Sequence, residues 1–440
     1  MIARSNNPNS WRYYQKGLKK KARRRSALNR VMLLFVYMVL IGATYTASWI
    51  LADGDRWEEG PLTTAKWEDV KPEKFGKQDL PSLLGGLNLD EVPATHHYPL
   101  DPGGMRLAAE VPIDTVLQQY ILNLLRRSLT HQAAVVVLQP KTGQILAMAD
   151  YKKVPEGEDE NLCLKAEFPA ASLFKIVSAA AAIEARGFTP SKTVVFRGMK
   201  HTLYNSQLRQ KEGRYNRKTS FRKAFAGSIN PVFGKIGIYD LGRKNIAEYA
   251  DRFLFNQEIP FDLPVGVSHI RIPADDFGLA EIASGFNKRT RISPVHASLI
   301  TAAVANHGMI TEPWLVRRIT DESGTVLYRA RFSRLARPIE EGTAKKLKVL
   351  MKETVLYGTC RKAFLPLRRN KRFKDIELGA KTGTINDPND RYKYDWVTAY
   401  ALPKDETKGI SVTILAIHGK KLGIRAADLA RYIIRHHFRS

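Results

Sequence analysis

The stretch FPAASLFKIVSAAAAIEARG, residues 168–187, places a serine and a lysine three positions apart at the front of an apolar segment. On a helix, side chains three residues apart share one face, so Lys175 would lie beside the Ser172 hydroxyl. A serine hydroxyl is a weak nucleophile until a base removes its proton, and a lysine buried among apolar groups can be that base because burial lowers its pKa. The pair predicts an activated serine. The structural alternative is a helix cap, with Pro169 before it and Gly187 ending the helix.

A second motif lies downstream, in the stretch AFAGSINPVFGKIG. One residue separates Ser228 from Asn230, and Pro231 interrupts regular helix at this point. Ser228 is suited to relay a proton between Lys175 and a leaving amine, and the Asn230 amide is suited to hold a substrate backbone. The structural alternative is a helix cap followed by a turn.

The third motif is Lys381-Thr382-Gly383-Thr384 in ELGAKTGTI, a segment that reads as a strand. Lys381 and Thr382 would bind a substrate carboxylate, and Gly383 would let a substrate backbone lie close to the strand. The structural alternative is the polar end of a strand. The same three letters occur at residues 141–143, but there they sit in a turn led by proline, ahead of the serine helix. Order and strand context therefore select the second copy.

The elements that would position these motifs follow from hydrophobic periodicity and turn residues. Two strands joined by a tight turn at residues 140–143 are expected over residues 133–151. We predict that this hairpin and the C-terminal strands pair in one antiparallel sheet flanked by helices, an α+β arrangement. The predicted helices are 114–129, the serine helix, about 219–241, about 243–254, 294–306 and 426–438, and the predicted C-terminal strands are 376–384, 394–402 and 410–417.

The N-terminal region has a different character. Residues 1–30 carry ten Lys and Arg and no acidic residue, and residues 31–52 carry no charge. Twenty-two helical residues span about 33 Å, enough to cross a membrane, and the flanking cations favour a cytoplasmic N-terminus. We predict a basic cytoplasmic tail (1–30), a transmembrane anchor (31–52), a tether rich in Pro and Gly (53–105) and a globular domain (106–440). A cleaved signal peptide is the alternative to the anchor.

Charge and cysteine content narrow the function further. The formal net charge is +27, but outside the tail the basic residues form no motif interleaved with aromatic residues, so no nucleic-acid partner is predicted. The chain has two cysteines, Cys163 and Cys360, and an extracytoplasmic location permits a disulfide between them. Neither cysteine has a neighbour at metal-ligand spacing, so no zinc site is predicted.

The three motifs in this order resemble those of the penicillin-binding protein transpeptidase family, within the serine DD-peptidase and β-lactamase superfamily. Further stretches resemble that family too, among them VVVLQPKTGQILAM, LAEIASGFNKRTRISPVHASLITAAVANHGMITEPWLV and the YGTCRKAF, AKTGT and DWVTAY segments. The resemblance covers residues from about 106 to 440. It implies the transpeptidase fold of that superfamily, here preceded by one transmembrane helix.

The resemblance also implies a reaction. Ser172 would attack the penultimate D-alanine carbonyl of a peptidoglycan stem peptide, with Lys175 as the acylation base. The backbone N–H groups of Ser172 and Thr384 would form the oxyanion hole. The amine of a second stem would then attack the acyl-enzyme to form a cross-link. No metal or cofactor is implied, and penicillins would acylate Ser172 as inhibitors.

The implied setting is the bacterial cytoplasmic membrane, crossed once, with the N-terminus inside and the catalytic domain in the periplasm. The implied partners are peptidoglycan stem peptides, the membrane and other cell-wall synthesis proteins. Two departures from larger relatives are visible: no glycosyltransferase domain is present, and the stretch before residue 106 is shorter than the usual pedestal of monofunctional transpeptidases. Three alternatives stay open, namely a DD-carboxypeptidase, a β-lactamase or β-lactam sensor, and a non-catalytic wall-binding scaffold. No residue in the sequence selects an amine over water as the acceptor.

Overall fold

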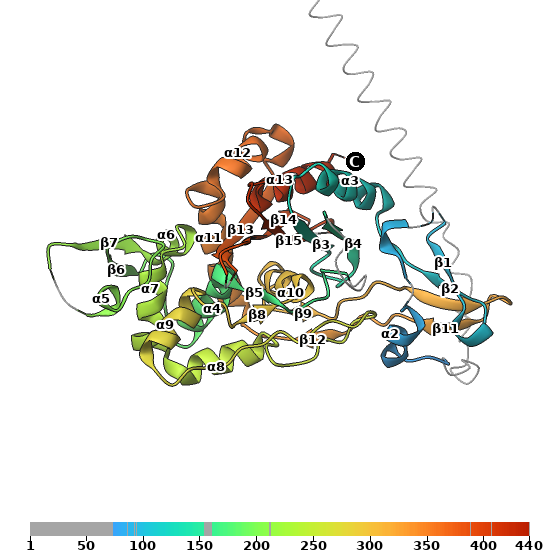
Figure 1. Cartoon of the computed structure of the whole chain (residues 1–440), viewed down its shortest axis with the longest axis horizontal. Helices are drawn as coiled ribbons and strands as arrows, with labels where there is room; N and C mark the ends of the chain where they lie inside the picture. The colour runs from blue at the N-terminus through green and yellow to red at the C-terminus, as the bar shows by residue number, and fades with distance from the viewer. Residues whose placement is uncertain are drawn as a thin grey trace, which may run out of the picture. The chain divides into compact units, whose positions relative to one another are not determined.

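The architecture centres on a five-stranded antiparallel sheet (Figure 1). The computed structural model describes residues 74–439 apart from residues 86, 92, 94, 154–160, 211–212, 388 and 406. The strand order is β13-β14-β15-β3-β4, so β13 and β4 are the two edge strands. The strands are β3 (Gln132–Leu138), β4 (Ile145–Lys152), β13 (Ile376–Asn386), β14 (Lys393–Pro403) and β15 (Ile410–His418).

The sheet joins the two ends of the domain in sequence. β3 and β4 form a hairpin whose turn contains Gly143 at a φ of 75°, a conformation that glycine adopts without steric cost. β15 then pairs antiparallel with β3, with Val135 opposite Ile414. The prediction that the hairpin and the C-terminal strands share one antiparallel sheet is therefore confirmed.

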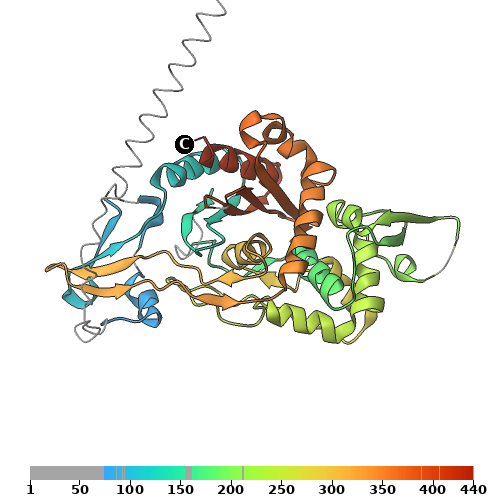
Figure 2. The same cartoon turned by 180° about the vertical axis from the view of Figure 1, so that it is seen from behind.

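The sheet is apolar on both faces, and alternate residues of each strand face opposite cores. Val135 and Val137 lie in the core under α3, α12 and α13, whereas Val136 and Leu138 lie in the larger core that contains α4 and α10. Figures 1 and 2 show α10 and α13 on opposite sides of the sheet. The main helices are α3 (Thr115–Arg126), α4 (Lys175–Glu184), α6 (Phe221–Ala226), α7 (Asn230–Lys235), α8 (Gly242–Arg252), α9 (Asp276–Ser284), α10 (Pro294–Ala305), α11 (Glu341–Leu356), α12 (Arg361–Arg369) and α13 (Ala426–His437).

Helix boundaries follow their capping residues. Asp114 accepts a hydrogen bond from the Leu117 N–H at the start of α3, and Ser293 accepts one from the His296 N–H at the start of α10. The single helix expected over about 219–241 is instead three pieces, because the chain breaks between α6 and α7 and continues into a π-helical turn, η7 (Ile236–Leu241).

Further sheets were not foreseen from the sequence. β1 (His97–Leu100), β2 (Leu107–Glu110), β10 (Arg318–Asp321) and β11 (Val326–Arg329) form a four-stranded sheet in the order β1-β2-β10-β11. The domain boundary predicted at residue 106 falls between β1 and β2, which pair with each other. Two-stranded pairings join β5 (Phe168–Pro169) to β8 (Arg291–Ile292), β6 (Thr193–Arg197) to β7 (Asn216–Ser220), and β9 (Ile310–Thr311) to β12 (Arg334–Ala336).

The basic tail (1–30) and the anchor (31–52) predicted from the sequence lie outside the described residues, as does the tether up to residue 73. Within the described ranges, no helix combines the length and apolar character needed to cross a membrane. Cys163 and Cys360 are both free and buried, and they belong to cores on opposite faces of the sheet.

Candidate active site

Ser172 lies in a short 3-10 turn, η6 (Ala171–Phe174), that leads directly into α4. Its hydroxyl makes no capping hydrogen bond, so the structural alternative of a serine N-cap is not what the chain adopts. Ala171 has a φ of 48°, a strained value for a residue with a side chain. Gly285, at a φ of 63°, packs against this turn so closely that a Cβ there would lie 1.9 Å from the Ala171 carbonyl oxygen. The close contact with Gly285 therefore helps to hold the backbone before Ser172 in this conformation.

Lys175 is the residue that faces the Ser172 hydroxyl. Its Nζ lies 2.8 Å from Ser172 Oγ and 2.8 Å from Asn230 Oδ1, and it donates to the Ser284 carbonyl oxygen. The side chain is fully buried, and no carboxylate of the described residues forms an ion pair with it. Burial, with a smaller contribution from the Lys381 charge, holds the pKa of Lys175 well below its ordinary value. The unprotonated amine that a base requires is therefore easier to reach than in an exposed lysine.

Ser228 and Asn230 flank the break between α6 and α7. Ser228 has a φ of 50°, and Asn230 is the first residue of α7, with Pro231 next to it in the first turn, where a missing N–H costs nothing. Both side chains are buried. The Ser228 hydroxyl accepts a hydrogen bond from Lys381 Nζ at 3.0 Å, while the Asn230 amide oxygen accepts from Lys175. The break between the helices therefore aims one side chain at each lysine.

Lys381 is the second buried lysine of the site. It projects from β13, is fully buried, and donates to Ser228 Oγ and to the Thr382 carbonyl oxygen at 2.7 Å. Burial lowers the pKa of Lys381 to about 7. Thr382 Oγ1 lies 2.6 Å from Thr359 Oγ1, which ties β13 to the loop before α12. The two motifs at 228–230 and 381–384 are thus joined by a direct hydrogen bond between Lys381 and Ser228.

The edge strand β13 lies directly against the serine turn. A Cβ built on Gly383 would lie 3.2 Å from Ala171 Cβ and 3.3 Å from Ser172 N, closer than most side-chain contacts. Trp396 on β14 adds a hydrogen bond from Nε1 to the Pro169 carbonyl oxygen at 3.0 Å. Glycine at position 383 therefore sets how closely the strand approaches the nucleophile.

A cleft of about 630 Å³ opens over these groups. Five of the residues singled out in the sequence line it, while Lys175, Lys381 and Gly383 lie buried beneath it. The rest of the lining lies outside the three motifs, although parts of it fall in the family-like segments at 279–316, 357–364 and 395–400. His201, Arg425, Ala427 and Asp428 lie in none of these segments. The lining residues are Ser172, His201, Ser228, Asn230, Gly285, Phe286, Thr359, Lys362, Ala363, Thr382, Thr384, Asp395, Arg425, Ala427 and Asp428.

The other Lys-Thr-Gly copy is not part of this cleft. Residues 141–143 form the turn of the β3–β4 hairpin, and a Cβ on Gly143 would lie 2.1 Å from the Glu312 carbonyl oxygen. Over the described ranges, no three His, Cys, Asp or Glu side chains are grouped as metal ligands would be.

The comparison with known families defines the class of protein. The chain matches the penicillin binding protein transpeptidase domain over residues 133–434, and it belongs to this family. The matched region holds all three motifs and all five strands of the central sheet.

Individual relatives agree with the family. The chain is 25% identical over 336 residues to stage V sporulation protein D of Bacillus subtilis, covering 73% of this chain and 50% of the relative. It is 26% identical over 348 residues to the peptidoglycan D,D-transpeptidase PbpA of Mycobacterium tuberculosis, covering 69% of this chain and 66% of the relative. The chain thus spans half to two thirds of the length of these curated relatives.

Solved structures show the same fold. The D,D-transpeptidase domain of a peptidoglycan glycosyltransferase from Eggerthella lenta superposes with a TM-score of 0.62 at 20% identity, covering 75% of this chain and 82% of that one. An imipenem acyl-enzyme complex of penicillin-binding protein A from M. tuberculosis superposes with a TM-score of 0.61 at 22% identity, covering 74% and 78%. The α+β transpeptidase fold expected from the sequence is confirmed.

The burial of Lys381 predicts a pH-dependent stability cost. Its pKa is about 7 in the folded protein, below the value of 10.5 for a free lysine, so between these values the unfolded chain binds more protons. Burial of the Lys381 charge therefore lowers the free energy of unfolding by its full amount below pH 7. This destabilisation disappears as the pH rises toward 10.5. Lys381→Met, which keeps the volume and removes the charge, should gain free energy of unfolding relative to the parent as the pH falls from 10 to 7.

Urea denaturation of both proteins at pH 6, 7, 8.5 and 10 measures this difference. Lys374→Met is the control, because Lys374 is exposed and its replacement should change the free energy of unfolding equally at every pH. A Lys381→Met difference that is flat across the pH range would contradict the lowered pKa.

Proposed function

We propose that the chain is a serine acyltransferase that cross-links D-alanyl-D-alanine stem peptides of peptidoglycan, a DD-transpeptidase that β-lactams inhibit. The observation that carries the proposal is the geometry at the serine: Ser172 Oγ faces the cleft 2.8 Å from a buried lysine whose pKa is lowered. Membership of the transpeptidase family and the activity named for the mycobacterial relative support it.

In the proposed acylation, Lys175 takes the proton of Ser172 as Oγ bonds to the penultimate D-alanine carbonyl carbon. The developing oxyanion is stabilised by the backbone N–H groups of Ser172 and Thr384. The proton then passes from Lys175, with Ser228 as relay, to the departing amine of the terminal D-alanine as its C–N bond breaks. The amine of a second stem peptide then attacks the acyl carbon and gives a proton to Lys175. The bond from that carbon to Ser172 Oγ breaks, and Lys175 passes the proton to Oγ, which restores the free serine.

Substrate binding is assigned to β13 and α7. The outer edge of β13 carries unpaired backbone groups, which suit a substrate backbone laid alongside it as an added strand. Lys381 and Thr382 would take the terminal carboxylate, and the Asn230 amide would hold the substrate backbone. Gly383 has no side chain, so the substrate backbone could lie close against β13 at this position.

We place this activity outside the cytoplasm, on a chain anchored once in the bacterial cytoplasmic membrane by residues 31–52. The ten basic residues before that uncharged run support the orientation. Other cell-wall synthesis proteins would be partners of such an anchored enzyme.

The covalent site is tested with a fluorescent penicillin. The protein should be labelled at one serine, Ser172, because this hydroxyl alone faces the lysine base within the described cleft. Peptide mapping of the adduct and the Ser172→Ala variant give the readout. An adduct on another residue, or undiminished labelling of Ser172→Ala, would rule out the assignment. Product analysis with stem peptides then separates cross-linking from hydrolysis.

The two Lys-Thr-Gly copies give a matched pair of variants. Lys381→Ala should slow acylation by penicillin about ten- to a hundred-fold, because a charge-assisted hydrogen bond to the carboxylate contributes roughly 1.5 to 3 kcal/mol. Lys141→Ala should leave the rate near that of the parent, because Lys141 lies in the exposed hairpin turn. The second-order acylation rate is measured after thermal melting confirms folding, and equal rates for the two variants would mean that the site is misplaced.

The membrane orientation is tested with reporters fused after Ser440. A reporter that works only outside the cytoplasm should be active there, since the cations before residue 31 hold the N-terminus inside. Activity of a cytoplasm-only reporter at the same position would reverse the orientation and remove the wall substrate from reach.

A further inference from the structure

The cleft has two rims, and the proposed reaction uses one of them. The first rim carries Ser172, Ser228 and Asn230, and the strand β13 forms the floor beside it. A second group of lining residues, here called the second rim, lies at and around the starts of α12 and α13. Its members are Thr359, Lys362, Ala363, Arg425, Ala427 and Asp428. Thr359, Lys362 and Ala363 fall in the YGTCRKAF segment, but none of the six residues belongs to the three catalytic motifs read from the sequence.

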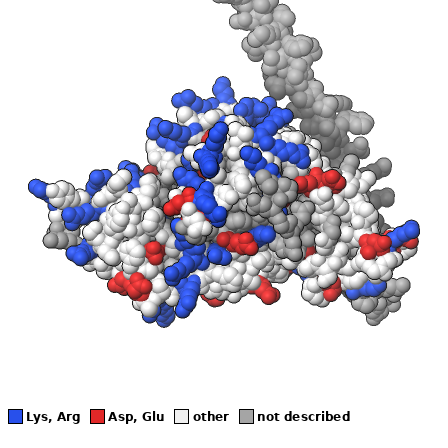
Figure 3. Space-filling view, viewed as in Figure 1, with Lys and Arg blue, Asp and Glu red and all other residues white. Residues whose placement is uncertain are grey.

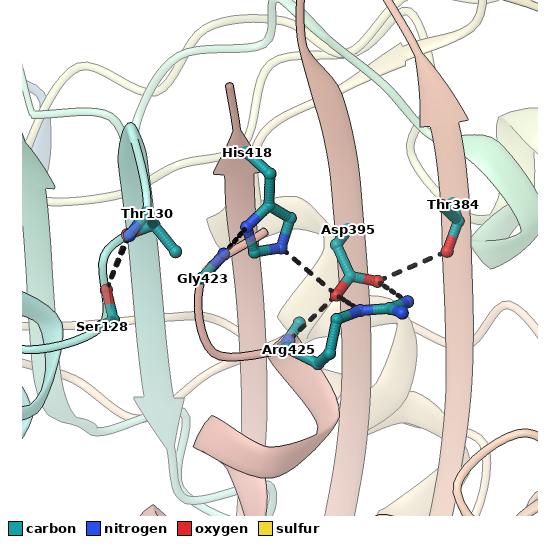
Figure 4. Close-up of polar contacts among 8 residues, drawn as sticks. Ser128, Thr130, Thr384, Asp395, His418, Gly423 and Arg425 are labelled. Atoms are coloured by element: carbon teal, nitrogen blue, oxygen red, sulfur yellow. Dashed lines mark hydrogen bonds and ion pairs between the residues drawn. The ribbon is translucent and has the colours of Figure 1, made fainter. Parts of the chain in front are cut away.

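Arg425 is a second-rim side chain that is paired with the Asp395 carboxylate (Figure 4). Its Nε donates to Asp395 Oδ2 at 2.6 Å and one of its amino groups, Nη2, donates to Asp395 Oδ1 at 2.9 Å. This is the two-point geometry in which a guanidinium and a carboxylate fit best. Arg425 remains about half exposed, whereas Asp395 is almost fully buried, with side-chain exposures of 48% and 4%. The pair thus has a buried anchor and an accessible cation.

The surroundings of Asp395 keep its carboxylate ionised. Burial by itself would raise its pKa, but the nearby His418 ring, the hydrogen bonds and charge of Arg425 and the Ala426 N–H together lower the pKa to about 2. His418 Nδ1 accepts from the Gly423 N–H, which leaves the proton on Nε2, the nitrogen 3.6 Å from Asp395 Oδ2. The carboxylate therefore holds Arg425 across the whole pH range in which the protein would work.

The same carboxylate reaches the reaction centre. Asp395 on β14 stands opposite Thr384 on β13, and Thr384 Oγ1 donates to Asp395 Oδ1 at 3.3 Å. Thr384 is the residue whose backbone N–H is assigned to the oxyanion hole. Arg425 is thus only one hydrogen-bonded side chain away from the residue that would contact the reacting carbonyl.

Donors remain on Arg425 after Asp395 is satisfied. A guanidinium has five N–H groups, and the two bonds to Asp395 use two of them. Within the described part of the chain, Nη1 donates no hydrogen bond to a protein group, and it belongs to a side chain that lines the cleft. Because Asp395 already fixes this side chain, binding an anion there costs little conformational entropy.

The charge of the rim continues along α12. Seven of the fourteen residues 361–374 are Lys or Arg and none is acidic, and all seven are exposed. Lys362, in the first turn of α12, lines the cleft itself. Figure 3 shows Lys and Arg side chains gathered over this part of the surface. The basic surface therefore runs from the cleft outward, which favours an anionic ligand portion entering from this side.

We propose that Arg425 is a specificity-determining residue that binds a carboxylate of the stem peptide other than that of the terminal D-alanine. Asp395 is its positioning residue, and Lys362 adds positive charge beside it. This inference rests on the proposed function. The carboxylate belongs to the acyl donor or to the acyl acceptor, and amidating one strand at a time distinguishes the two sources.

The experiment compares stem peptides whose carboxylates are all free with the same peptides amidated at every carboxylate except that of the terminal D-alanine, first as donor and then as acceptor. The parent should prefer the free carboxylate in one arm by about ten-fold or more in kcat/KM, as a charge-assisted pair would give. Arg425→Gln should reduce that preference to near one, mainly by raising KM for the free-carboxylate peptide. Asp395→Asn should lose much of the preference although Arg425 is present. Without the Asp395 carboxylate, the Arg425 guanidinium is no longer held in the orientation that points it into the cleft.

Arg369→Gln is the matched control, because Arg369 is an exposed cation on α12 outside the cleft, and it should keep the parent preference. Penicillin labelling of Ser172 and thermal melting show that each variant is folded and that the serine is competent. Failure of labelling in the parent would count against the proposed function itself. A parent without preference in either arm, or an Arg425→Gln variant that keeps it, would overturn this inference.

Discussion

Two lysine side chains are buried in one small site where no carboxylate of the described residues forms an ion pair with them, and the rest of the structure is arranged around that constraint. Lys175 and Lys381 are both fully excluded from solvent, and each is held by hydroxyl, amide or carbonyl oxygens. A buried ammonium without an anionic partner is costly, so these amines give up protons readily. An ion pair at either position would stabilise the fold and abolish that property.

The strained backbone that positions these lysines and their partners is stable only because neighbouring elements pack tightly around it. The positive φ values at Ala171 and Ser228 occur at the serine turn and at the break between α6 and α7. Each is enclosed by well-packed elements: Gly285 and β13 press on the serine turn, and Lys381 bonds to Ser228. The central sheet, packed on both faces, supplies the rigidity that keeps these local conformations from relaxing.

The order and spacing of the motifs were sufficient to predict which side chains meet, and strong periodicity was sufficient to predict the sheet that carries them. Other features of the structure have no recognisable pattern in the sequence. The strands of the β1-β2-β10-β11 sheet have four residues each, too few for alternation to stand out. The 3-10 turn at Ser172 depends on contacts from Gly285, more than one hundred residues away in the chain. The pairing of Asp395 with Arg425 depends on tertiary contact alone, because single charged residues at that separation form no readable pattern.

The closing of the sheet by β15 against β3 also bears on how the protein folds. Val135 and Ile414 are partners although roughly 280 residues of chain separate them, so this pairing must overcome a large loop-closure entropy. Until β15 is available, β3 presents an unpaired edge that is apolar from Ala133 to Leu138, a surface prone to association with other chains. The edge strand β13 reaches the sheet only through β14 and β15. The serine turn follows β3 and β13 precedes β15 in the chain, so β13 takes its place in the sheet beside the nucleophile only when both ends of the domain have come together.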